Sequence, residues 1–213
     1  MAINRSAPES FNYNNTDKKD KNFMYKNLKR SNCYNCDFST SNFDYASFRG
    51  AHFKRCSFMK CTFKGAEFIG TNLKGSKFKN AIFENTIFEG VNLNGADFKD
   101  AEFKNTVFVA TDIDKIRNLD VEDTNIRIFD EMPQLEISDE LRDATINVMD
   151  NIYIKKSRIF DTKDGDINTL TLMILLENFD EEYLIKGLNM IKSEIDRDFH
   201  TLSYIIRLMQ NIK

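Results

Sequence analysis

Four cysteines lie close together in the sequence and supply the kind of side chain that a structural zinc site uses. Cys33 and Cys36 form a C-x-x-C pair, and Cys56 and Cys61 follow them. All four occupy positions of a five-residue repeat at which other copies carry small or apolar residues, as is typical of cysteine used for packing. We therefore predict that these thiols pack in a core, bind no metal ion and, in an intracellular setting, form no disulfide.

Candidate catalytic residues are few. The chain has two histidines, His52 and His200, and neither has an evident partner in the sequence. It has no glycine-rich phosphate loop and no pair of histidines at metal-binding spacing. If Gly165 were the glycine of an EF-hand loop, Phe160 would stand where the first calcium ligand belongs. The sequence therefore predicts a protein that is not an enzyme, with no catalytic residue, no cofactor and no metal.

A repeat of five residues organises the first half of the chain. From Phe23 to Ile113 a large apolar residue or cysteine recurs at every fifth position, and fourteen of these nineteen centres are Phe. From Ser31 to Thr111 the residue two before each centre is no larger than Val, such as Ala66 before Phe68. Residues two apart lie on the same side of a strand, so the small residue and the centre that follows it can both point inward. The next small residue comes three positions after the centre and would point outward in a continuous strand. The chain must therefore turn once in every pentapeptide. No helical stripe fits this period.

The repeat resembles the pentapeptide-repeat family. The motifs that carry the resemblance read AxF, as in Ala46-Ser47-Phe48, Ala66-Glu67-Phe68, Ala81-Ile82-Phe83 and Ala101-Glu102-Phe103. The resemblance implies a right-handed, quadrilateral, parallel β-helix with four pentapeptides in each coil. A mainly β solenoid of about five coils is expected, in which each unit buries its apolar face against its neighbours.

Three segments are predicted along the chain. A flexible N-terminal arm spans 1–20, the β-helix spans 21–128, and an α-helical domain of three to four helices spans 129–213. After Ile113 the repeat slips, and an irregular half coil is expected to end near Ile128 with Ile126 as a centre. The predicted helices lie behind Ser138 and at about 167–178, 181–195 and 199–212, with Asp180 and Asp198 as N-caps.

Charge separates the two domains. Residues 21–115 hold fifteen basic and ten acidic residues, a net of plus five, whereas 116–213 hold twelve and twenty, a net of minus eight. The family's best-known activity, which the resemblance implies as an alternative, is mimicry of DNA at a type II topoisomerase, DNA gyrase, through an acidic rod. This rod is short and basic. We therefore expect a non-catalytic, cytoplasmic protein–protein interaction module, a rigid solenoid with a helical cap.

Two outward surfaces are candidate binding sites. One is an apolar patch, which strand propensity alone would also explain; it comprises Ile69, Ile82, Ile87, Val107 and Val109. The other is a basic face, which is either a nucleic-acid site or solvated charge; it comprises Arg49, His52, Lys54, Arg55, Lys60 and Lys74. The expected partner is a protein of unknown identity, or a second copy bound through the apolar face or the helical domain. Nucleic acid is the alternative, and no membrane association is expected.

Overall fold

The computed structural model describes residues 10–211, in which a parallel β-solenoid is followed by a helical region. The solenoid makes about six turns over residues 12–129. The chain divides into two compact units, Met1–Glu131 and Met132–Lys213. The solenoid and the helical region that the sequence predicts are therefore both present.

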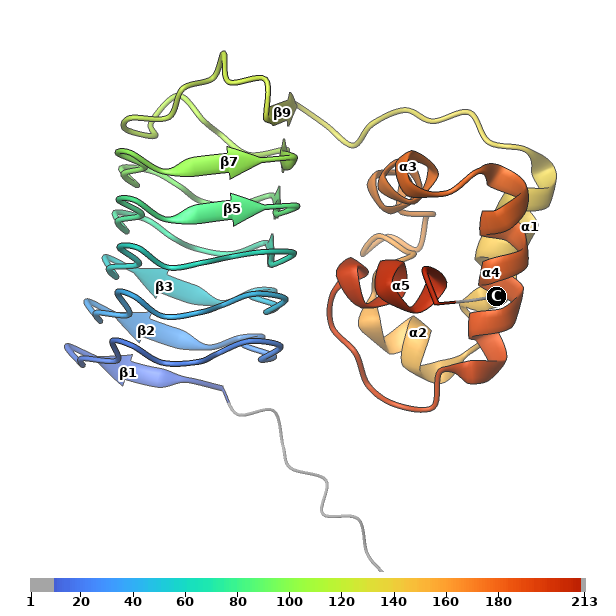
Figure 1. Ribbon diagram of the computed structural model, residues 1–213, viewed down its shortest axis with the longest axis horizontal. Coiled ribbons are helices and arrows are strands. Elements are labelled where there is room, and N and C mark those ends of the chain that lie inside the picture. The colour runs from blue at the N-terminus through green and yellow to red at the C-terminus, as the bar shows by residue number, and fades with distance from the viewer. Residues whose placement is uncertain (1–9, 212–213) are drawn as a thin grey trace, which may run out of the picture. The chain divides into compact units, whose positions relative to one another are not determined.

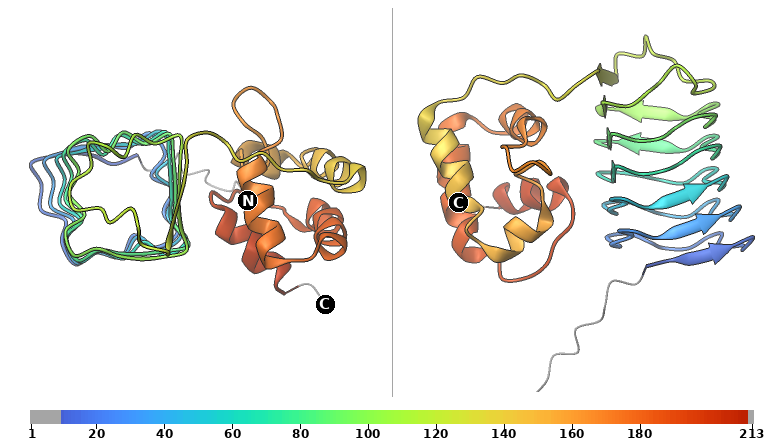
Figure 2. Two further views of the ribbon diagram at one scale, coloured as in Figure 1. Left: turned by 90° about the horizontal axis from the view of Figure 1, so that it is seen from above. Right: turned by 180° about the vertical axis from the view of Figure 1, so that it is seen from behind.

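The solenoid is built from short parallel strands that pair with the residues one coil later. Asn12 pairs with Asn32, which pairs with His52, so one coil is twenty residues. Seen along its axis, the stacked coils form a four-sided outline (Figure 2). The strands form three sheets (Figure 1). The first sheet contains β1 (Asn12–Asn14), β2 (Asn32–Tyr34) and β3 (His52–Lys54), and the second contains β4 (Glu67–Ile69), β6 (Ile87–Glu89), β8 (Thr106–Val109) and β9 (Ile126–Phe129). The third contains β5 (Ile82–Glu84) and β7 (Glu102–Lys104).

Each pentapeptide turns at its last residue, which has a positive φ angle. Asn80 and Asn105 have φ angles of 55° and 48°, and Gly70 has one of 59°. Glycine and asparagine tolerate this conformation better than other residues do. In many of the turns the next residue adds a hydrogen bond across the turn, as where the Ala81 N–H donates to the Phe78 carbonyl at 3.0 Å. The predicted turn in every pentapeptide is therefore confirmed, and it directs both apolar positions inward.

Stacked phenylalanine rings fill the interior. In one column, the ring of Phe83 lies 5.0 Å from that of Phe63 and 5.2 Å from that of Phe103, with interplanar angles of 6° and 10°. Most of the ring-bearing centres are fully buried. Inward hydroxyl groups donate to carbonyl oxygens of the preceding coil, as from Thr86 to Phe63 at 2.6 Å. The core therefore leaves these polar groups satisfied.

The two ends of the solenoid differ from the sequence-based prediction. The expected flexible arm is wrong from residue 12 onward, because those residues form a first coil whose strand β1 pairs with β2; residues 1–9 lie outside the described part. The solenoid has about six turns rather than five. At the other end β9 restores the twenty-residue register, so Ile128 rather than Ile126 aligns with Phe108.

The helical unit contains five helices in the described residues, where three to four were expected. They are α1 (Asp139–Val148), α2 (Ile152–Ser157), α3 (Thr169–Asn178), α4 (Glu181–Glu194) and α5 (Leu202–Met209). Ser138 and Asp180 cap α1 and α4, as predicted, by accepting hydrogen bonds from Leu141 N and Tyr183 N. The predicted cap at Asp198 is wrong, because α5 begins after Thr201.

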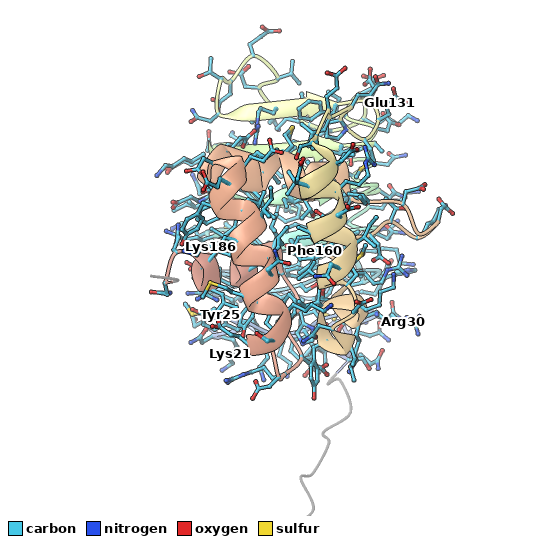
Figure 3. All side chains as sticks on the ribbon, turned by 90° about the vertical axis from the view of Figure 1, so that its right-hand side faces the viewer. Lys21, Tyr25, Arg30, Glu131, Phe160 and Lys186 are labelled. Carbon is cyan, nitrogen blue, oxygen red and sulfur yellow. The ribbon has the colours of Figure 1, made fainter. Side chains whose placement is uncertain are left out.

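Helices α1 and α4 form a parallel pair within this unit. The Ser138 hydroxyl donates to Glu181 where both helices begin, and Asn147 donates to Asn189 farther along at 3.2 Å. Figure 3, in which Lys186 of α4 is labelled, shows the two helices side by side. None of the helices in residues 10–211 has the length and apolarity needed to cross a bilayer.

Candidate interaction surfaces

The four cysteines are free thiols that point into the solenoid. All four are buried, and burial raises the pKa of Cys33, Cys56 and Cys61 to about 12. The Cys61 thiol donates to the Phe38 carbonyl at 3.0 Å, the same bond that hydroxyl groups make elsewhere in the core. In residues 10–211 no three His, Cys, Asp or Glu side chains gather as a metal site would require. The cysteines thus take the packing positions that the register assigns to them.

The two histidines belong to different units of the chain. His52 is on β3 with an exposed side chain, as its place beside a buried Phe predicts. His200 precedes α5. In the interior of the solenoid the side chains are aromatic, aliphatic, thiol or small hydroxyl groups, and they pack against one another.

The apolar patch is assembled by the pairing of β4, β6, β8 and β9. Ile87 lies directly beside Val107, and Ile69 and Val109 flank Glu89 from the two neighbouring strands. Ile87, Val107 and Val109 are buried and Ile69 is half-buried. Four of the five predicted members therefore share one sheet.

The fifth predicted member of the apolar patch, Ile82, lies on a different sheet. It starts β5 and its side chain is 43% exposed. Its neighbour in the next coil is Glu102 rather than an apolar residue. Ile82 is therefore the member of the predicted patch whose side chain is most exposed.

A carboxylate interrupts the apolar patch. Burial raises the pKa of Glu89, and the positive charge of Arg49 partly offsets this effect. Arg49 belongs to the pentapeptide that precedes β3 and so lies outside the sheet of β1, β2 and β3. The structure therefore separates Arg49 from the rest of the predicted basic face.

The predicted basic face is centred on β3 and the coil that follows it. His52 and Lys54 belong to β3, Arg55 is the turn residue after it, and the bridge from His52 to Asn72 places Lys74 next to Lys54. The Arg55 guanidinium donates to the Tyr34 hydroxyl at 2.8 Å. These residues therefore form one surface.

Sequence reasoning missed two further cations beside this surface. Lys77 and Lys79 flank the buried Phe78, and both are exposed. Ser57 pairs with Lys77, and Lys60 N donates to the Lys79 carbonyl at 2.9 Å, so these lysines continue the surface across the next turn. Folding the sequence into rows of twenty would have placed all of them together.

Two models of pentapeptide repeats match the solenoid, over residues 53–107 and 27–59. No curated protein sequence matches the chain. One similar solved structure is HetL, a pentapeptide repeat protein involved in heterocyst differentiation regulation in the cyanobacterium Nostoc, at 16% identity and a TM-score of 0.38, covering 47% of this chain and 45% of HetL. The chain thus spans less than half of HetL.

Two further solved structures are similar over a larger share of the chain. One is a pentapeptide repeat protein of the Arabidopsis thaliana thylakoid lumen, at 22% identity and a TM-score of 0.30, covering 75% of this chain and 88% of the other. The second is QnrB1, a plasmid-mediated fluoroquinolone resistance protein, at 16% identity and a TM-score of 0.29, covering 63% and 77%. The family models and the twenty-residue register of paired strands agree, and the chain is a pentapeptide repeat protein with C-terminal helices.

Proposed function

We propose that this protein is a non-catalytic interaction module that binds a protein partner on an outer face of its solenoid. The observation that supports this proposal is the filled interior. Stacked rings occupy three of the four columns, aliphatic side chains and a thiol fill most of the fourth, and the inward hydroxyl groups bond to the backbone. A solenoid packed in this way offers rigid outer columns rather than a cavity for a substrate.

The candidate surface for that partner is the outer face of β5 around Ile82, because Ile87, Val107 and Val109 are buried in the structure. Large apolar side chains exposed on an outer face are typical of protein interfaces. Ile82, which is 43% exposed, is the position from which contact with a partner can be measured directly. Mimicry of DNA at a topoisomerase would need an acidic surface, whereas the middle coils of this solenoid carry a basic one.

The cytoplasm is the compartment that we propose for this module. Its four cysteines are all free thiols. Proteins of oxidising compartments use cysteine mainly in disulfides, whereas reduced thiols are usual in the cytosol.

Site-specific photocross-linking in cells tests the proposed protein contact. A photoreactive residue replaces Ile82 in one variant and Asn14, an exposed residue of β1, in a matched control. We expect adducts of discrete mass at position 82 and none at position 14. An adduct of twice the chain mass identifies a second copy, and another discrete mass identifies a different protein. The absence of an adduct at position 82, or the same adducts of heterogeneous mass at both positions, would refute the proposal.

A further inference from the structure

Two neighbouring coils carry a surface of positive charge without acidic residues. In segments 51–60 and 71–80 there are six lysine or arginine residues and no Asp or Glu. We define these six as the basic patch. Its members are Lys54, Arg55, Lys60, Lys74, Lys77 and Lys79. Five of their side chains are exposed and that of Lys54 is half-buried. The patch covers two adjacent sides of the solenoid, one of which contains β3 (Figure 1).

The charges of the basic patch are not neutralised within the described part of the chain. None of the six cations forms an ion pair with residues 10–211. On another face, Lys64 and Lys104 both contact Glu84, at 3.3 and 3.4 Å. The patch therefore differs from the face of Lys64, Glu84 and Lys104 in pairing as well as in composition.

Two of the acidic residues that border the basic patch already have partners. In the column of Lys77, Asp37 lies two coils before it and Asp97 one coil after it. Asp37 contacts Lys19 at 3.3 Å. Asp97 accepts a hydrogen bond from the Asn118 amide at 2.7 Å and contacts Arg117 at 3.6 Å. These carboxylates therefore border the patch without cancelling its charge.

The arrangement of the basic patch fits an extended polyanion. Lys54 and Lys74 occupy one column of adjacent coils, which lie about 4.8 Å apart. Like charges directly opposite each other in a sheet are destabilising. A row of anionic groups laid along the coils would remove that repulsion, whereas a single small anion would reach only part of the patch.

The composition of the patch favours phosphate groups over an acidic protein surface. Lysine is depleted in protein–protein interfaces. Lysine, arginine, asparagine, serine and tyrosine together are the usual side chains that contact nucleic-acid phosphates. Beside its cations the surface presents Asn72, Asn80, Ser57 and Tyr34. These residues can donate hydrogen bonds to phosphate oxygens.

The aromatic residues of these coils favour a duplex over a single strand. Proteins that bind single strands stack bases on exposed aromatic rings. Phe53, Phe58 and Phe78 are the aromatic residues of segments 51–60 and 71–80, and all three are fully buried. Tyr34 of the preceding coil is engaged by Arg55. We propose that the basic patch binds the sugar–phosphate backbone of a nucleic-acid duplex, without reading its sequence.

Salt-dependent binding of a fluorescent 24-base-pair duplex DNA by the full chain tests this proposal. Because six cations can release at most six counterions, the slope of log K against log salt should be no steeper than about −5. This slope corresponds to a loss of affinity of about 10³-fold between 50 and 200 mM salt. A second DNA duplex of scrambled sequence should bind equally well.

A matched pair of variants locates the site. The patch variant carries Lys74→Gln, Lys77→Gln and Lys79→Gln, and the control carries Lys64→Gln, Lys104→Gln and Lys115→Gln, whose lysines are ion-paired elsewhere. Both lose three charges. We expect the patch variant to lose about half of the salt slope, while the control keeps the wild-type slope. Because the substituted side chains are exposed, we expect both variants to stay folded, and circular dichroism verifies this.

Several outcomes would overturn the proposal. It fails if no duplex binds at 50 mM salt, or if the two variants weaken binding equally, since net charge alone would then explain the result. Tighter binding of single-stranded DNA would reject the duplex. Equal binding of polyglutamate with the same salt slope would assign the patch to an acidic protein surface instead. Ile82 is not altered in any of these variants, so the protein-partner proposal is tested separately.

Discussion

Replacing Phe83 with alanine tests the phenylalanine ladder on which the solenoid depends. Phe83 is fully buried, and its ring stacks between those of Phe63 and Phe103 at 5.0 and 5.2 Å. Replacement of a buried phenylalanine by alanine usually costs about 3 to 5 kcal/mol of unfolding free energy. We expect a value near the upper end, because two stacked neighbours lose contact and backbone hydrogen bonds hold the adjacent coils apart.

Two control substitutions provide reference values for the loss of unfolding free energy. Ile82→Ala removes an adjacent side chain that is 43% exposed and should cost less than about 1 kcal/mol. Phe103→Ala removes a half-buried ring that stacks on only one coil neighbour in its column, Phe83, so its cost should lie between the other two. The expected order of destabilisation is therefore Phe83, Phe103, Ile82.

Urea unfolding followed by circular dichroism measures the three differences in unfolding free energy. Domains of this size are typically stable by about 5 to 15 kcal/mol, so the loss expected for Phe83→Ala is a large share of the total. Because solenoids are stabilised mainly between neighbouring units, hydrogen exchange should show the loss first in the coils on either side of residue 83. If Ile82→Ala were as damaging as Phe83→Ala, the assignment of inward and outward positions would be wrong.

Three further predictions concern a turn, a helix cap and the buried thiols. Ala110 has a φ angle of 48°, so Ala110→Gly should raise the unfolding free energy by about 0.5 to 1 kcal/mol in a urea titration; a loss would mean that this turn is not left-handed. Asp180→Ala removes the side-chain cap of α4 and should lower the thermal midpoint through a loss of about 1 kcal/mol, whereas Glu182→Ala should have a smaller effect. Burial raises the pKa of Cys56 from 9.0 to about 12, so the unfolded state loses the thiol proton first as the pH rises and stability should fall above pH 9. Cys56→Ser should reduce this fall, and an unchanged pH profile would contradict the burial of that thiol.

The sequence by itself determined the repeat, the inward direction of its apolar positions and the starts of two helices, α1 and α4. A period of five with a small residue two positions before each Phe has one solution, a turn in every pentapeptide, because the constraint is local to five residues. The caps at Ser138 and Asp180 were predictable for the same reason, since a capping side chain bonds to an N–H only three residues away.

The tertiary structure alone decided where the solenoid begins and which exposed residues share a surface. In the first coil only Phe23 joins the phenylalanine ladder, by stacking on Phe43, and the start of the coil is defined instead by backbone hydrogen bonds to the next coil, such as the 2.6 Å bond from Asn32 N to the Phe11 carbonyl. No pattern within a pentapeptide contains that information. Lys77 and Lys79 join the basic patch for the same reason. Their neighbours are set by the pairing of whole coils and by the turn between two sides, whereas the local repeat specifies only that they point outward.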